Sequence, residues 1–157
     1  MTMKKSHALI LSLFIIIASC KKNNDDKFTG ISANINGKAW QAKYITAFEG
    51  APFIDIDMVG LYAVPGDTTQ LEIVVPDSIQ VNKPNPFQST TVRYYLNDST
   101  TYDGLTTYGH GMVTVTSLDT TDHKVAGIFN GVLYNIADDN DSVSVTNGRF
   151  NISYSRF

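Results

Sequence analysis

Two aspartates on one predicted strand have the spacing in this chain that comes nearest to a catalytic pair. Asp55 and Asp57 alternate with isoleucines, so a strand places both carboxylates on one face, about 7 Å apart. That separation suits the general acid and general base of an inverting glycosidase. Such pairs normally come from different strands, however, and this alternation is also typical of an ordinary half-exposed strand. We expect the ordinary strand.

The histidines and the acidic turns offer ligands for a metal ion, but their spacing matches no metal motif. The acidic segment 138–141 lacks the spaced oxygen ligands and the distal glutamate of a calcium loop, which favours a solvated turn. His110 and His123, even with Asp119 and Asp122 nearby, are few for a zinc site. Neither histidine has a serine or cysteine nucleophile in a recognisable arrangement. We therefore predict no catalytic residue, no metal site and no cofactor.

A tyrosine-bearing polar segment is the best candidate for ligand contact. Residues 97–110 are rich in threonine and tyrosine and include Tyr102 and Tyr108. Tyrosines on a long loop can stack on sugar rings or anchor a protein partner, because the ring is broad and rigid and its hydroxyl can stay hydrated. The alternative is that these rings fold onto the end of the core.

A triplet of Asp, then Ser or Thr, then an aliphatic residue or Thr recurs along the chain. It is similar to the O-glycosylation motif of envelope proteins in Bacteroidetes-type bacteria, and turn chemistry is an equally good cause, since Asp and Ser/Thr cluster in turns. The hydroxyl-bearing residues of these triplets are Thr68, Ser78, Ser99, Thr120 and Ser142. We expect some of them to carry glycans if the first interpretation holds.

The N-terminus predicts export and lipid attachment. A basic start with Lys4 and Lys5 precedes the apolar run 8–18, which is about half as long as a membrane-spanning helix requires. This pattern is typical of a secretory signal peptide. The segment Ile17-Ala18-Ser19-Cys20 resembles a bacterial lipobox. That resemblance implies cleavage after Ser19 and acylation of Cys20, the only cysteine of the chain, so that lipid anchors the protein to a membrane.

The segment after Cys20 predicts a tether. Residues 21–27 contain no apolar side chain and suit a flexible linker. Asp25 and Asp26 resemble the acidic signal that sends some Bacteroidetes-type lipoproteins to the cell surface, and a simple solvated linker explains them equally well. We expect an outer-membrane lipoprotein, on either its periplasmic or its surface face, organised as signal peptide 1–19, lipidated tether 20–27 and a single domain 28–157.

Composition and charge narrow the remaining classes. The chain has 157 residues, of which 43% are hydrophobic and 17% charged, so collagen-like, coiled-coil and disordered proteins are excluded. Its net charge is −3, and removal of residues 1–19 with their two lysines makes it −5. A negative chain lacks the electrostatic footprint of a nucleic-acid binder. The single cysteine excludes an internal disulfide.

Hydrophobic residues after Phe28 recur with period two, which predicts strands. Asn36-Gly37 predicts a tight hairpin turn, and Asn147-Gly148 predicts a second turn or a bulge. Gly127 and Gly131 fall between large residues on one strand face, which suits close sheet packing or a barrel corner. Strands are expected at 31–35, 40–48, 54–58, 71–75, 92–96, 113–118, 124–134 and 142–154. We predict an all-β fold, an antiparallel β-sandwich of about eight strands or, alternatively, a closed or flattened barrel.

The turn and core motifs resemble a family of small, uncharacterised Bacteroidetes-type lipoproteins. The carrying segments are INGKAW at 35–40, VTVTSLDTTDHKVAGIFNGVL at 113–133 and VSVTNGRFNISY at 143–154. One departure is Ile128, where the family often has threonine. The family is a domain of unknown function, so the resemblance implies a lipid anchor and β-hairpins but no catalytic or binding residue.

Two classes of function remain. The first is a non-catalytic binding module on the outer membrane that engages a glycan, a small ligand or another envelope protein through loops at one end of the sheet. The second is a small envelope hydrolase, or a hydrolase inhibitor. An enzyme would need Asp55, Asp57, His110 or His123 to meet a second acidic group within hydrogen-bond reach. The sequence favours the binding module.

Overall fold

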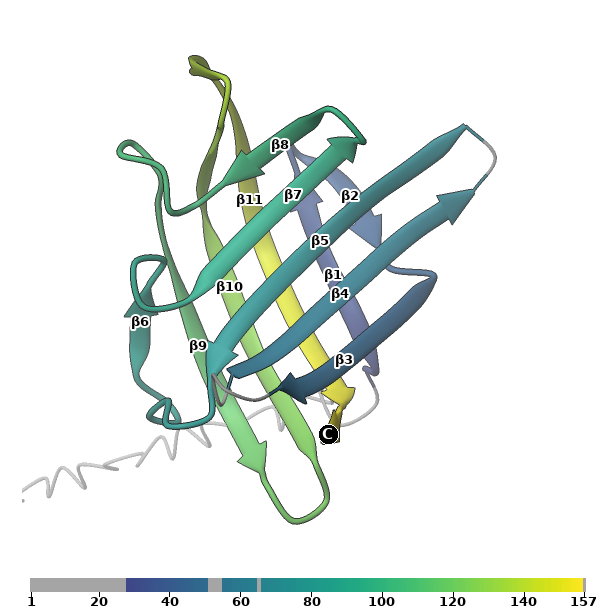
Figure 1. The fold of residues 1–157 in the computed structure, drawn as a ribbon, viewed down its shortest axis with the longest axis vertical. Coiled ribbons are helices and arrows are strands. Elements are labelled where there is room, and N and C mark those ends of the chain that lie inside the picture. The colour runs from purple at the N-terminus through teal and green to yellow at the C-terminus, as the bar shows by residue number, and fades with distance from the viewer. Residues whose placement is uncertain (1–27, 51–54, 65, 157) are drawn as a thin grey trace, which may run out of the picture.

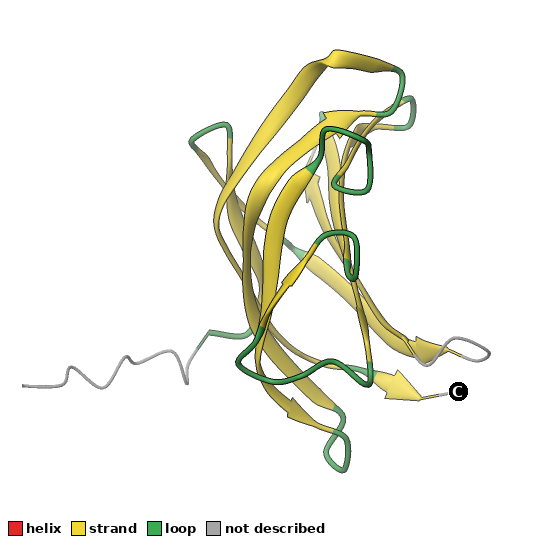
Figure 2. Ribbon diagram, turned by 90° about the vertical axis from the view of Figure 1, so that its left-hand side faces the viewer, coloured by secondary structure: helices red, strands yellow, loops and turns green. Residues whose placement is uncertain are grey.

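The protein is built from strands and short turns. A computed structural model describes residues 28–50, 55–64 and 66–156, among which there is no helix (Figures 1 and 2). The strands are β1 (Gly30–Ile35), β2 (Lys38–Gln41), β3 (Tyr44–Gly50), β4 (Asp55–Val64), β5 (Asp67–Pro76), β6 (Pro84–Pro86), β7 (Thr91–Asn97), β8 (Thr100–Asp103), β9 (His110–Asp119), β10 (Lys124–Asn135), β11 (Asp138–Ser153) and β12 (Ser155–Arg156). The all-β prediction is confirmed.

The strands form one curled sheet. Its order is β12-β3-β4-β5-β7-β8-β10-β11-β1-β2, with β9 beside β10 and β6 beside β9. All pairs are antiparallel except β12 with β3, so the sheet is mixed. Figure 2 shows the sheet curling into a half-barrel. Of the two architectures that alternation left open, one curled sheet lies nearer to the barrel than to two separate packed sheets.

The first hairpin forms as its sequence predicts. Asn36 and Gly37 have φ values of 48° and 77°, the left-handed pair that a two-residue turn requires. The strand expected at 40–48 is divided, however. The Ala42 amide still donates to Ile31 of β1 (2.9 Å), whereas the Lys43 amide donates to Leu61 of β4 (2.7 Å). The chain changes partner strand between these two residues.

Two segments outside the strands expected from periodicity also form strands. Residues 84–86 form β6, which pairs with the outer edge of β9, a position where proline removes no essential ladder hydrogen bond. Residues 100–103 form β8, which pairs with β7 and β10. The prediction of a continuous loop from 97 to 110 is therefore wrong. These short strands raise the number above the eight that periodicity indicates.

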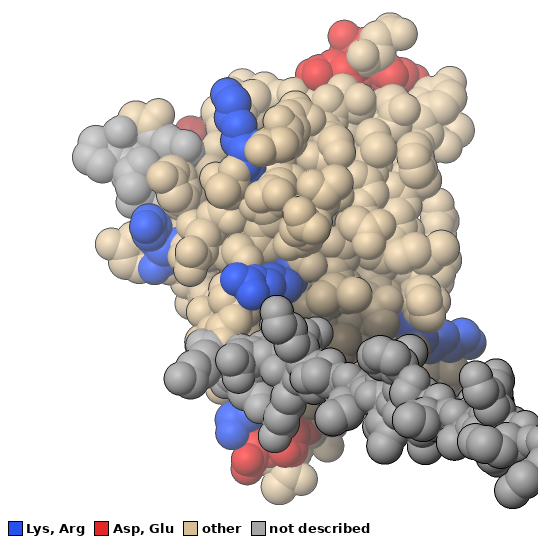
Figure 3. Space-filling model, turned by 180° about the vertical axis from the view of Figure 1, so that it is seen from behind, with Lys and Arg blue, Asp and Glu red and all other residues tan. Residues whose placement is uncertain are grey.

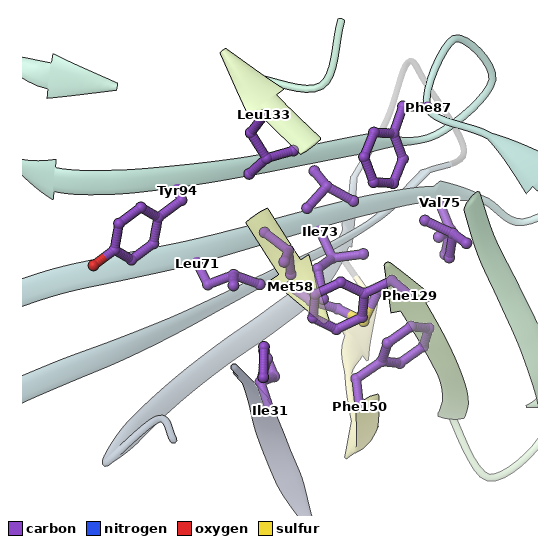
Figure 4. Packing of buried hydrophobic residues seen from close by; sticks show 14 of the residues in the cluster. Ile31, Met58, Leu71, Ile73, Val75, Phe87, Tyr94, Phe129, Leu133 and Phe150 are labelled. Atoms are coloured by element: carbon purple, nitrogen blue, oxygen red, sulfur yellow. The ribbon is translucent and has the colours of Figure 1, made fainter. Parts of the chain in front are cut away.

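The core fills the inside of the curl. Phe129 and Phe150 lie side by side with centroids 6.3 Å apart, and Phe87 joins the same end of the core (Figure 4). A Cβ at Gly127 would overlap the Phe150 ring, and one at Gly131 would lie 2.6 Å from Phe87. The expectation that these glycines permit close packing is confirmed, because large rings occupy the space above them.

A bulge bends β11. Ser32 pairs with Arg149, but Asn34 pairs with Thr146, so β11 has one extra residue at this point. Asn147 lies in the bulge with φ of 51°. Of the two alternatives for Asn147-Gly148, the structure has the bulge, which increases local twist and re-aims nearby side chains.

Candidate functional site

An aromatic cavity opens at one end of the curled sheet. This mouth cavity has a volume of about 340 Å³, within the range of small-ligand sites. Its walls come from strands far apart in sequence, and its ring-bearing and rim residues are Trp40, Tyr62, Tyr94, Tyr102, Leu96 and Lys38. Apolar and polar groups both line the cavity, as is usual for a ligand pocket.

Period-two alternation directs these rings inward. Trp40 on β2 pairs with Ala33, whose side chain lies in the core. Tyr94 on β7 pairs directly with Tyr102 on β8, so both rings face the same side of the sheet. Tyr62 follows the buried Met58 and Gly60 on the inner face of β4. Four separate strands thus each contribute one ring to the mouth cavity.

The rings occupy fixed positions in two pairs. Trp40 and Tyr62 have centroids 6.4 Å apart at 44°, and Tyr94 and Tyr102 are 6.2 Å apart at 33°. The Trp40 indole Nε1 donates to Thr69 Oγ1 at 2.8 Å. Because these tilted pairs and the buried hydrogen bond restrict the side chains, a ligand would meet rings that are already oriented.

An aspartate holds the tyrosine side of the cavity. The Tyr102 hydroxyl donates to Asp141 Oδ2 at 2.9 Å, and the Asn135 amide donates to the same oxygen at 2.9 Å. Burial, followed by the hydrogen bond to Asp141, raises the pKa of Tyr102. The hydrogen bonds from Asn135 and Tyr102 lower the pKa of Asp141. The tyrosine therefore stays neutral and the aspartate ionised at physiological pH.

The structure separates the two tyrosines that the sequence singled out. Tyr102 is only 6% exposed and lines the mouth cavity from inside the sheet. Tyr108 is 53% exposed, and its ring contacts Tyr134 at 5.8 Å. Tyr134 pairs with Asp103, on the face opposite to Tyr102. The two rings therefore do not form one site.

The aspartates with the spacing of a catalytic pair lie on the outer face of β4. Asp57 lies on the same face as Glu72 of β5, because it pairs with Val74, two residues along the strand from Glu72. Burial, followed by the negative charge of Glu72, raises the pKa of Asp57. Glu72 accepts a hydrogen bond from Tyr95 at 2.7 Å and pairs with Arg93 at 3.4 Å. Arg93 also donates to Asp103 at 2.7 Å. This cluster faces away from the mouth cavity.

The same cluster changes the acidity of its neighbours. Burial and the hydrogen bond to Glu72 raise the pKa of Tyr95 to about 12. The hydrogen bond to Asp103 raises the pKa of Arg93 further above its usual value. Arg93 thus stays charged between two carboxylates, as expected for a buried network that links strands.

The histidines and acidic turns do not converge. His110 begins β9, whereas His123 lies in the turn beyond its far end and contacts Tyr154 at 5.5 Å. Asp119 Oδ1 accepts the Thr121 and Asp122 amides, each at 2.9 Å, and these bonds lower its pKa. Among the described residues, no group of three or more His, Cys, Asp or Glu is placed to hold a metal ion.

The five triplet hydroxyls are accessible. Thr68, Ser78, Ser99, Thr120 and Ser142 are all exposed. The backbone hydrogen bonds of Asp119 support the turn interpretation of its triplet. The exposure of the five hydroxyls is also compatible with O-glycosylation. Both interpretations therefore remain predictions. Cys20 and the signal segment lie outside the described residues, and within the described part no helix is long and apolar enough to cross a membrane.

No protein family, curated protein or solved structure matches this chain. The sequence indicated Tyr102 but missed Trp40, Tyr62 and Tyr94 as its neighbours. The alternation of the sequence predicts that these three rings point inward. It does not predict that they meet at one end of the sheet, because that depends on how far each strand extends.

Proposed function

We propose that this protein is a lipid-anchored envelope binding module that takes a small ring-bearing ligand, such as a sugar residue, in the mouth cavity. The observation that carries the proposal is the convergence of four oriented aromatic rings around a cavity of about 340 Å³. Flat aromatic walls bind ring faces, and the rigid arrangement reduces the entropy lost on binding.

The electrostatics of the rim support an uncharged or weakly anionic ligand. Lys38 stands at the rim of the cavity, and Lys43 Nζ lies 5.8 Å from the Tyr62 ring centroid. Asp141 is directed to Tyr102 and Asn135 rather than left free. A cationic ligand would meet Lys38 at the rim, which is unfavourable.

A thermal-melting screen of the purified whole chain tests this function. We expect one of a panel of sugars and ring-bearing metabolites to raise Tm by roughly 10 °C when present at 100 times its Kd. The Leu96→Ala variant should weaken that ligand about fivefold, because half an apolar side chain is lost from the cavity rim.

Leu105→Ala is the matched control. Leu96 and Leu105 are 44% and 45% exposed, but only Leu96 lines the mouth cavity. Equal loss of affinity in both variants, or no ligand across the panel, would argue against the mouth cavity as the site.

The lipid anchor is tested separately from the ligand. We expect the intact mass of protein purified from native membranes to exceed the mass of the peptide from Cys20 by its acyl groups. Additional hexose-sized increments would indicate glycans on the exposed triplets. Cys20→Ser should move the protein to the soluble fraction, because one thiol carries the anchor. A Cys20→Ser protein that stays with the membrane would contradict the anchor.

A further inference from the structure

A second hollow lies mainly over the outer face of β1, β10 and β11 and extends to β2. This outer groove has a volume of about 750 Å³, and its polar side chains are Ser32, Asn34, Gln41, Asn130, Asn147 and Arg149. A smaller hollow of about 230 Å³ adjoins it at Ile128 and Arg149, and Phe28 lines this smaller hollow. Trp40 and Tyr62 line both the outer groove and the mouth cavity, so β2 separates the two.

The bulge of β11 shapes the outer groove and places an amide in it. Phe129 pairs with Gly148 and Gly131 with Val145, so the extra residue of β11 interrupts the pairing with β10 near Asn130 as well as the pairing with β1. Bulges are common beside sites because they re-aim side chains. Among the described residues, the Asn34, Asn130 and Asn147 side chains have no hydrogen-bond partner. These exposed or half-exposed amides are therefore available to a ligand.

Arg149 is held in position but keeps its terminal nitrogens free. Its Nε donates to Ser32 Oγ at 3.1 Å, and its Cζ lies 3.9 Å from the centroid of the Phe28 ring. No acidic side chain of the described residues pairs with Arg149. Because Nε bonds to Ser32 and the guanidinium plane stacks on Phe28, the two terminal nitrogens Nη1 and Nη2 remain as parallel donors. This arrangement binds a carboxylate in bidentate fashion.

The charges around the outer groove indicate the charge of its ligand. No Asp or Glu of the described residues lines the outer groove or the smaller hollow. In Figure 3 the acidic side chains gather at the top and bottom of this face, away from its centre. One guanidinium without a second cation matches a single negative charge better than a phosphate dianion. The neighbouring amides and the Ser32 hydroxyl suit the hydroxyl groups of a sugar.

We infer that the outer groove binds a carboxylated saccharide, with Arg149 holding the carboxylate and Asn130 and Asn147 contacting sugar hydroxyls. Arg149, Asn130 and Asn147, which carry this inference, do not line the mouth cavity, although Trp40 and Tyr62 line both hollows.

Calorimetric titration of the purified whole chain tests the inference with three probes: a galacturonic acid trimer, the same trimer as its methyl ester, and glucose 6-phosphate. We expect the acid trimer to bind, and its affinity to fall as salt is added. The methyl ester should bind at least tenfold more weakly, because the charge-assisted bonds are lost. The sugar phosphate should bind more weakly than the acid trimer.

Two variants locate the site. Arg149→Gln should weaken the acid trimer by about tenfold to a hundredfold, whereas Lys83→Gln, the same charge change on an exposed side chain outside the outer groove, should not. Asn147→Gly should weaken it severalfold while keeping the backbone, because glycine accepts the positive φ. Arg149 is exposed, so its variant should keep the wild-type Tm.

Three results would overturn the inference: no binding of the acid trimer, equal binding of the acid and its ester, or equal effects of Arg149→Gln and Lys83→Gln. Tighter binding of glucose 6-phosphate would overturn the assignment of a carboxylate. Binding in the mouth cavity can be tested separately, because Leu96→Ala should leave the affinity for the acid trimer unchanged.

Discussion

Asp57 carries an energetic cost that the alternating sequence does not reveal. On an exposed strand face a carboxylate costs little, but here burial and the nearby charge of Glu72 raise its pKa above the ordinary 3.8. Its Oδ1 is buried without a hydrogen-bond partner among the described residues. A buried carboxylate oxygen without a donor is destabilising in its charged form.

The Asp57→Asn variant should therefore be more stable than the wild type at pH 7. A carboxyl with a raised folded-state pKa binds its proton more tightly when folded, so stability falls as pH rises from about 3.8 through that pKa. The advantage of Asp57→Asn should shrink as the pH is lowered toward 3.8 and vanish below it. Denaturant unfolding at a series of pH values measures this. An advantage that grows in acid would contradict the account.

At the scale of elements, the Glu72–Arg93–Asp103 network joins three neighbouring strands on the outer face. Glu72 belongs to β5, Arg93 to β7 and Asp103 to β8, and the two acidic side chains are only 14% and 12% exposed. β8 is short, with four residues, so its few ladder bonds gain support from this network. The network explains how a polar segment expected to be a loop becomes a strand.

Arg93→Leu should destabilise the protein by about 1–3 kcal/mol, because it leaves two largely buried carboxylates without their cation. Lys124→Leu is the control, since Lys124 and Asp122 form a pair that is 58% and 62% exposed and such pairs contribute little. Urea unfolding compares the two variants. A loss no larger for Arg93→Leu than for Lys124→Leu would show that the network does not stabilise the sheet.

Sequence periodicity predicts the longer strands but not which residues of different strands come into contact. The β1–β2 turn follows from Asn36-Gly37, because its φ values require those residue types. β8 could not be predicted, since its stability depends on Arg93 and on pairing with β10. Tyr102 lines the mouth cavity, but the polar sequence around it indicated a loop. Phe87, fully buried, lies among prolines, and its burial depends on glycines from other strands.

At the scale of the whole molecule, the curl depends on glycines covered by phenylalanines. Gly127→Ala should lower the free energy of unfolding by about 1–3 kcal/mol, because its methyl group would overlap the Phe150 ring. Gly50→Ala is the matched control, since its Cβ would meet Phe48 only at an ordinary 3.7 Å. Thermal unfolding distinguishes them. Equal stability of both variants would contradict the role of Gly127 in the curl.

The curl also creates the site, because a flat sheet would not bring Trp40, Tyr62, Tyr94 and Tyr102 to one cavity. Trp40 is the only tryptophan in the chain, so its fluorescence reports from a single position. Trp40 also lines the outer groove, and Leu96, which lines only the mouth cavity, distinguishes the two. The most direct measurement is a fluorescence titration with the ligand that raises Tm most. The account predicts a saturable change in Trp40 emission whose Kd is weakened by Leu96→Ala and not by Leu105→Ala. Stabilisation by that ligand with unchanged Trp40 emission would contradict it.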